Sequence, residues 1–453
     1  MIRKNIAKYI GLPLQDMVKR TSIIETLNFL RVSQYWDETR INEYQLNKLR
    51  NLIDYASRYV PYYEKKFKKI KLSSKDILTL DDIDKVPILT KEILRNEREK
   101  LVSRHFPMKY VKKGKTGGTT GVPVIVYKDI YNRSFTWATY YRWYEWMGLN
   151  YYDSSATFWG APTVLSSSLR NKVKARSKQF IQNTLFLNSF NMNEETLGVF
   201  SKSIINQEPA IIKGYLSSLL DFAKYIDDNN LKFVNLKAIS STTETLLPHN
   251  REYLEGIFGA PIFDQYGCGE ISAISYECSK HNGLHIQQEH VICEVLDDMD
   301  NPMMNSTGRV VATDLDNLVM PFIRYENGDF ATLTDIKCTC GVNQPLMESI
   351  EGRSVDTITL KDGSKVHGVF FTDIFYEIGI LTDVAQKFQV YQEKLGAIDF
   401  KIQSRKALDA KLRQKLIDSL LVFFDIVNYS EHKILPKEKN GKFKYIINTI
   451  NHS

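Results

Sequence analysis

The chain lacks long apolar runs, and this absence limits where the protein can reside. None of its apolar stretches reaches the ~20 residues of a membrane-spanning helix. The opening segment, MIRKNIAKYIGLPLQDMVKR, also lacks the continuous apolar core and small-residue cleavage site of a secretory signal. The sequence therefore predicts a soluble, cytoplasmic protein with no transmembrane segment.

Cysteine is scarce as well, since 453 residues contain five cysteines. Such a small, odd number excludes a disulfide framework and indicates reduced thiols. Cys338 and Cys340 form a C-x-C pair, and Cys278 lies upstream in YECSKHNGLHI, close to His281 and His285. Three thiolates and one imidazole would make a tetrahedral zinc site. Buried reduced thiols are the alternative interpretation.

An excess of one charge is also missing, because 60 basic residues face 53 acidic ones for a net charge of +7. Basic clusters such as YEKKFKKIKL and KLRQKL alternate with apolar residues, as solvated helix faces do. This mixing favours a small anionic substrate over a nucleic-acid partner. With 43% hydrophobic and 25% charged residues, the chain should be folded throughout.

The length of the chain favours two or three domains. Apolar residues at helical spacing in EYQLNKLRNLIDYASRYV predict a helical segment over 1–109. Short apolar strands then alternate with helical stretches over 110–351, a pattern typical of α/β architecture with a largely parallel sheet. A hairpin with an Asp-Gly turn opens a small α+β domain over 352–453.

One part of the middle region differs from the rest. Residues 290–333 contain successive strands joined by Asp, Asn and Gly turns and no helical pattern, which predicts a small β-barrel or a meander. In the flanking α/β parts, ligands are expected at the carboxyl ends of the strands.

The stretch KGKTGGTTGVPVIVYKD contains a glycine- and threonine-rich turn from Thr116 to Gly121. Successive backbone N–H groups and hydroxyls in such a turn can bind phosphate oxygens, because no side chain blocks the approach. The Walker spacing G-x-x-x-x-G-K-[ST] is absent. Taken alone, such a segment is more often a plain turn.

Two carboxylates follow glycine turns further along the chain. In DQYGCGEIS, Glu270 is suited to hold Mg²⁺ that bridges phosphate oxygens, and Tyr266 can stack on a base or shape a pocket. In RYENGDFA, Asp329 is suited to accept hydrogen bonds from a ribose diol. The motif GRSVD marks the predicted domain junction, and NGK places Lys442 on a terminal turn.

Taken in order, TGGTTG, YGCGE, NGD, GRSVD and NGK resemble the motifs of the adenylate-forming superfamily of acyl-CoA synthetases, peptide-synthetase adenylation domains and luciferases. Within it, the chain looks most like the phenylacetate-CoA ligase group and its capsular-polysaccharide-biosynthesis relatives, through LIDYASRYVPYYEKKF, DILTLDDIDKVPILTKEILR, YECSKHNGLHI and CTCG. The resemblance implies a large N-terminal domain with mostly parallel sheets and a small barrel-like part. It also implies a small α+β C-terminal domain that rotates on a hinge.

The implied reaction joins a carboxylic acid to Mg·ATP, giving an acyl-AMP and pyrophosphate, and then transfers the acyl group to a thiol such as that of CoA, or to an amine. The setting it suggests is capsular or surface polysaccharide biosynthesis. An aryl-CoA synthetase of the phenylacetate type and a non-catalytic nucleotide-binding homologue are the alternatives. We expect a monomer or homodimer.

The resemblance assigns a role to each matching residue. Phosphate contacts fall to Thr116, Gly117, Gly118, Thr119, Thr120 and Gly121, and the remaining nucleotide contacts to Ser241, Thr242, Glu244, Tyr266, Gly267, Asp329 and Arg353. Glu270 binds Mg²⁺, Asp356 is the hinge, and Lys442 bridges carboxylate and phosphate oxygens as charge develops. The acid pocket is assigned to Trp159, Tyr215 and Ser217, and a structural zinc site to Cys278, His285, Cys338 and Cys340.

The chain departs from the superfamily pattern at three points. Val124 stands where many relatives carry a lysine just after the phosphate loop, and Gly117 replaces the loop's second serine. The segment GVFFTDIFYEIGI replaces the glycine-rich start of the terminal domain.

Overall fold

The structure is a computed structural model and describes residues 2–115, 125–159, 169–189, 192–353, 357–363, 365–367, 370, 371, 374, 375, 378, 385–404, 407–436 and 443–450. The chain divides into two compact units. The first contains residues 1–153, 177–183 and 263–350, and the second contains 154–176, 184–262 and 351–453. None of the helices within the described ranges is both long and apolar enough to span a membrane.

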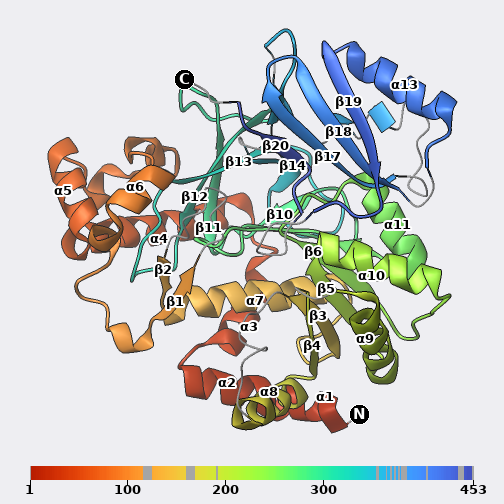
Figure 1. The fold of residues 1–453 in the computed structure, drawn as a ribbon. Coiled ribbons are helices and arrows are strands. Elements are labelled where there is room, and N and C mark those ends of the chain that lie inside the picture. Colours follow the sequence, from red (N-terminus) through yellow and green to blue (C-terminus); the bar gives the residue numbers. More distant parts are fainter. Residues whose placement is uncertain are drawn as a thin grey trace. The chain divides into compact units, whose positions relative to one another are not determined.

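Helices form the N-terminal half of the first unit, as the sequence predicted. They are α1 (Ile2–Ile6), η1 (Ala7–Gly11), α2 (Leu12–Lys19), α3 (Ile23–Ser33), α4 (Glu38–Tyr59), α5 (Pro61–Ile70), η2 (Ser74–Asp76), η3 (Asp81–Lys85), α6 (Lys91–Asn96), η4 (Arg98–Leu101), η5 (Met108–Tyr110) and α7 (Ile130–Trp146). Figure 1 shows α3 beside the long α7.

The longest of these helices, α4, has clear start and stop signals. The Asp37 side chain caps it by accepting a hydrogen bond from the backbone N of Arg40 at 2.9 Å. Leu49, Leu52 and Ile53 are buried in the core of the first unit, because helical spacing brings them onto one face. Pro61 cannot continue the hydrogen bonds of α4 and becomes the first residue of α5.

A seven-stranded sheet in the order β11-β12-β13-β14-β10-β9-β8 completes the first unit. Its strands are β8 (Gln265–Tyr266), β9 (Ser275–Glu277), β10 (Leu284–Ile286), β11 (Val291–Leu296), β12 (Thr307–Asp314), β13 (Tyr325–Thr334) and β14 (Leu346–Arg353). The strands β11 to β14 run in sequence order as a meander, one of the two expected forms. The barrel-like part stays a prediction. The hairpin of β1 (Lys112–Lys115) and β2 (Ile125–Lys128) precedes α7.

The second unit contains the parallel sheet that the alternating pattern predicted, in the order β4-β3-β5-β6-β7. Helices α9, α10 and α11 bury apolar residues against it. The elements are β3 (Ser155–Trp159), α8 (Leu169–Ile181), within which the division between the units falls, β4 (Thr184–Asn188), α9 (Glu194–Gln207), β5 (Ile211–Tyr215), α10 (Leu216–Asp228), β6 (Ala238–Thr242), α11 (Pro248–Phe258) and β7 (Ile262–Phe263).

The C-terminal part of the second unit has a core of its own, built around Phe371, Phe388, Phe400 and Leu416. Its elements are the predicted hairpin β15 (Thr357–Thr359) and β16 (Lys365–His367), then β17 (Ala385–Lys394), β18 (Ala397–Ser404), α13 (Ala410–Leu421), β19 (Ile426–His432) and β20 (Ile446–Asn448). The expected domain boundaries and the hinge stay predictions.

Candidate functional site

Three side chains from two motifs form a buried hydrogen-bonded group in the first unit. The Tyr266 hydroxyl donates to Asp329 Oδ2 at 2.8 Å and accepts from Asn327 Nδ2 at 2.7 Å. The exposed fractions of these side chains are 8%, 8% and 3%. Burial, followed by the negative charge of Asp329, raises the pKa of Tyr266 well above its usual value, so the hydroxyl stays a donor. The group therefore fixes the orientation of the Asp329 carboxylate.

The second predicted carboxylate, Glu270, is held in a similar way. Its Oε1 accepts a hydrogen bond from the Tyr325 hydroxyl at 3.0 Å, and the side chain is 5% exposed. The turn before it needs glycine, because a Cβ on Gly267 would lie 1.6 Å from the carbonyl oxygen of Ser272. Glu270 is thus placed by a close backbone approach that any other residue would prevent.

Lys128, at the end of β2, is a site residue that the motif comparison missed. Its ammonium donates to the Ser272 hydroxyl, directly after the Glu270 turn. Burial lowers the pKa of Lys128, while the charges of Asp314, Cys268 and Glu270 act in the opposite direction. The signal available in the sequence was a single lysine in an apolar strand, four residues after Val124. Lys128 therefore lies near Glu270 as a cation, although position 124 is a valine.

In the second unit, the carboxyl ends of the parallel strands bring the predicted pocket residues together. Trp159 ends β3 and Tyr215 ends β5, and their ring centroids are 4.7 Å apart. Glu244 accepts from the backbone N of Ser217 at 3.0 Å and from its hydroxyl at 2.9 Å. This edge therefore offers an aromatic surface next to a fixed carboxylate.

The loop after β6 carries the SSTTE motif. Ser241 and Thr242 are the last residues of the strand, and Thr243 has φ of 74°. A β-branched residue rarely adopts this left-handed conformation, and such strain is concentrated at functional sites. The backbone N of Phe443 donates to Glu244 Oε1 at 3.5 Å, so the residue that follows Lys442 in the chain lies against this loop.

Several predicted residues lie outside the described residues. They are Thr116, Gly117, Gly118, Thr119, Thr120, Gly121, Val124, Asp356 and Lys442. Arg353 is described as the last residue of β14, without its side chain.

The predicted zinc ligands meet at the sheet of the first unit. The ligand atoms of Cys278, His285, Cys338 and Cys340 all lie within 4.8 Å of one another. Cys278 Sγ lies 3.6 Å from Cys338 Sγ, and Cys340 Sγ lies 3.3 Å from His285 Nε2. Sulfur ligands of a tetrahedral zinc with Zn–S bonds of about 2.3 Å are roughly 3.8 Å apart, so this donor set fits the metal.

Contacts around the four side chains also suit a metal site. His285 Nδ1 lies 3.1 Å from the carbonyl oxygen of Gln344, which holds the proton on Nδ1 and leaves Nε2 as the free donor atom. Backbone N–H groups of Lys280 and Val342 point at the sulfurs of Cys278 and Cys340, each at 3.4 Å. Such N–H donors stabilise thiolates, the form that binds zinc.

A buried ion pair holds Gln344, the residue whose carbonyl oxygen contacts His285. Gln344 Nε2 donates to Glu289 Oε2 at 2.7 Å, and Arg142 on α7 donates to both oxygens of Glu289, at 2.7 and 3.1 Å. Arg142 and Glu289 are 0% and 1% exposed. Burial acts to raise the pKa of Glu289, but the charge and hydrogen bonds of Arg142, together with a hydrogen bond from Ser33, outweigh it and the pKa is lowered.

The fold is similar to that of a solved acyl-CoA ligase. The structure superposes on 2-hydroxyisobutyryl-CoA ligase in the postadenylation state, in complex with R3-HIB-AMP, with a TM-score of 0.75 at 15% sequence identity. The match covers 93% of this chain and 92% of that one. No family model matches the sequence.

Two relatives are similar over nearly the whole chain. CapK of Staphylococcus aureus is 24% identical over 424 residues, which is 90% of this chain and 89% of that protein. Phenylacetate-coenzyme A ligase of Thermus thermophilus is 21% identical over 417 residues, 85% of this chain and 86% of that enzyme. Both similarities agree with the resemblance that the ordered motifs indicated.

Proposed function

We propose that the protein activates a carboxylic acid with Mg·ATP, forming an acyl-adenylate and pyrophosphate, and transfers the acyl group to a thiol. The observation that carries this proposal is the pair of buried carboxylates, Glu270 and Asp329, each oriented by a tyrosine hydroxyl. They stand in the motifs YGCGE and NGD. A fold similar to a ligase crystallised with an acyl-adenylate supports the same reaction.

The nucleotide contacts follow from the chemistry of these groups. Asp329 is an acceptor for the ribose hydroxyls, and Tyr266 keeps its carboxylate in a fixed rotamer. Glu270 would hold Mg²⁺, because carboxylate oxygens suit this ion. The Tyr325 hydroxyl already engages one of the two oxygens and so orients the carboxylate. Bound Mg²⁺ would neutralise phosphate charge. Lys128 adds a fixed positive charge next to Glu270.

In the chemical step, an oxygen of the substrate carboxylate attacks the α-phosphorus and pyrophosphate leaves. Lys442 is proposed to stabilise the charge that builds up on these oxygens. Its neighbour Phe443 lies at the SSTTE loop through Glu244, which supports this role. The aromatic pair Trp159 and Tyr215 is the proposed wall of the acid pocket.

The acceptor is proposed to be the thiol of CoA, because two similar proteins are named as CoA ligases. An amine acceptor and a setting in capsular or surface polysaccharide biosynthesis stay predictions from the sequence. We also propose a structural zinc ion bound by Cys278, His285, Cys338 and Cys340, on the ligand geometry above.

The test is pyrophosphate release from ATP across a panel of aryl, fatty, amino and uronic acids, followed by thioester formation with CoA. We expect release with one class of acid and thioester formation only with that class. Absence of release with every acid, while ATP still binds, would support the non-catalytic alternative instead.

A further inference from the structure

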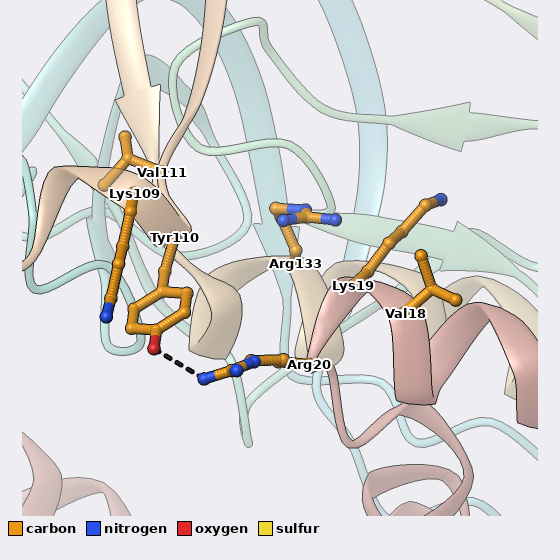
Figure 2. A pocket seen from close by; sticks show the side chains of 7 residues that line it. All are labelled: Val18, Lys19, Arg20, Lys109, Tyr110, Val111 and Arg133. Atoms are coloured by element: carbon orange, nitrogen blue, oxygen red, sulfur yellow. Dashed lines mark hydrogen bonds between the residues drawn. The ribbon is translucent and has the colours of Figure 1, made fainter.

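A cavity of about 260 Å³ in the first unit is lined by basic side chains that the proposed reaction does not use. It lies between the end of α2, the turn η5 and the start of α7, and its lining residues are Val18, Lys19, Arg20, Lys109, Tyr110, Val111 and Arg133 (Figure 2). In the β1–β2 hairpin, Lys112 lies opposite Lys128 at one end. Lys115 lies opposite Ile125 at the other end, where the chain enters and leaves the phosphate loop. The cavity, which includes Val111, therefore adjoins the Lys112 end of this hairpin.

Further cations act on the cavity from neighbouring elements. Burial, and then the charges of Lys178, Arg133 and Lys112, lower the pKa of Lys19 to about 8. Burial likewise lowers the pKa of Lys112 and of Arg133. Burial is the main cause of each lowered pKa; neighbouring cations add to it for Lys19 and Lys112, while Asp16 and Asp129 act in the opposite direction on Lys19 and Arg133.

The hydroxyl of Tyr110 also responds to the positive charge around the cavity. Its hydroxyl accepts a hydrogen bond from Arg20 Nη1 at 2.5 Å, as Figure 2 shows. Lys109 and Arg20 lie over the ring at 4.8 and 5.0 Å from its centroid. Lys109, followed by Arg20, lowers the pKa of the Tyr110 hydroxyl. Tyr110 thus also holds the Arg20 guanidinium at the edge of the cavity.

The two nearby carboxylates are already occupied. Asp16 accepts from the Thr21 hydroxyl at 2.6 Å and from the backbone N of Ile24 at 3.1 Å. Asp129 is fully buried and accepts four backbone N–H groups, two at the start of α7 and two from Leu318 and Val319. Within the part of the chain that the structure describes, no carboxylate forms an ion pair with the cations of the cavity.

We propose that this cavity binds a phosphate group of a small molecule, at a site separate from the phosphate loop. A phosphate is compact enough for the volume, carries two charges, and offers several acceptor oxygens to cations that line the cavity from three elements. Arg133 can bind two of its oxygens at once, while Lys19 acts as a point charge. The phosphate can be free or carried on a nucleotide, and the experiment separates these sources.

The test is calorimetric titration of the full-length protein with inorganic pyrophosphate and, separately, with adenosine 3′,5′-bisphosphate. We expect two pyrophosphate sites per chain in the wild type. The double variant Lys19→Ala with Arg133→Ala should lose one site or weaken it at least tenfold, because hydrogen bonds to charged groups contribute about this much each. Lys65→Ala on α5, an exposed lysine, is the matched control. The probe that binds more tightly at the cavity identifies the source of the phosphate.

The phosphate loop supplies an independent comparison. Thr119→Ala with Thr120→Ala should remove the other pyrophosphate site and leave the cavity site intact. If the double variant of Lys19 and Arg133 binds two pyrophosphate ions per chain, as Lys65→Ala does, the proposal is wrong, whatever the loop variant does. Loss of both sites in the loop variant alone would also overturn it, while leaving the proposed reaction in place.

A pH series adds a second readout. Affinity at the cavity should fall from pH 7 to pH 9, since Lys19 loses its proton in this range and Tyr110 moves towards ionisation. The other charged groups facing the site are Asp16, Arg20, Lys109, Lys112, Asp129, Arg133 and Lys178. Lys19→Arg should keep more of its affinity at pH 9 than the wild type does, and an equal decline in both proteins would contradict the assignment.

Discussion

Removing one hydroxyl, in Tyr266→Phe, tests whether the buried group around Asp329 organises the nucleotide site. The change deletes the donor to Asp329 Oδ2 at 2.8 Å and the acceptor for Asn327 Nδ2 at 2.7 Å, and keeps the ring. Asn327 is 3% exposed, so water cannot easily replace the lost partner. In the proposed reaction, the Tyr266 hydroxyl orients Asp329 and takes no part in the chemical step, so it acts as a positioning group.

The expected magnitude follows from the cost of an unsatisfied buried polar group. Leaving Asn327 Nδ2 without its acceptor should lower the free energy of unfolding by about 1–3 kcal/mol, measured by urea denaturation. If the same loss of order reaches Asp329, the KM for ATP should rise by roughly 5- to 100-fold, while kcat changes much less. ATP–pyrophosphate exchange at varied ATP measures both parameters.

Tyr62→Phe is the matched control. Tyr62 is half-buried, packs against the same core, and its hydroxyl makes no hydrogen bond within the described residues. We expect little change in stability or KM for this variant. A Tyr266→Phe protein with wild-type KM for ATP and reduced stability would show that the hydroxyl is structural only, and would refute the positioning argument.

Three further predictions concern other parts of the site. Glu289→Gln should destabilise the protein by about 3–5 kcal/mol at neutral pH, because it leaves Arg142 buried without its counter-ion; equal urea midpoints would contradict this. Because folding lowers the pKa of Glu289 below its ordinary value of 4.5, the stability that this pair contributes is present above that value and is lost as the pH falls through the folded pKa; the variant should lack this acid dependence. Zinc measured by mass spectrometry should be stoichiometric in protein purified without chelator and absent from Cys340→Ser, whereas a metal-free wild type would remove the zinc proposal. Lys128→Met should slow pyrophosphate release at least tenfold, and an unchanged rate would show that its charge does not act on the phosphates.

Local signals in the sequence were sufficient for much of the fold. Helical spacing predicted a helix over residues 43–60, and α4 begins five residues earlier because Asp37 supplies a cap that the apolar pattern does not contain. The parallel sheet followed from short strands alternating with helices, and the hairpin of β15 and β16 from its Asp-Gly turn. Turn chemistry and periodicity are local, so a single chain reveals them.

The partners of the site residues could not be predicted in the same way. Tyr325 and Glu270 are 55 residues apart, and nothing in either motif indicates that the hydroxyl of one meets the carboxylate of the other. The chain from Arg142 through Glu289 and Gln344 to His285 depends on tertiary packing in the same manner. Motifs therefore locate the carboxylates, while the buried polar contacts that orient them appear only in three dimensions.

The most direct test of the proposed reaction is pyrophosphate release by Lys442→Ala, compared with Lys433→Ala, an exposed lysine in the same terminal part of the chain. Both proteins should bind ATP, and release with the preferred acid should fall about 100-fold or more in Lys442→Ala and stay at the wild-type rate in Lys433→Ala. Equal release by Lys442→Ala and the wild type would contradict the adenylation mechanism proposed for this protein.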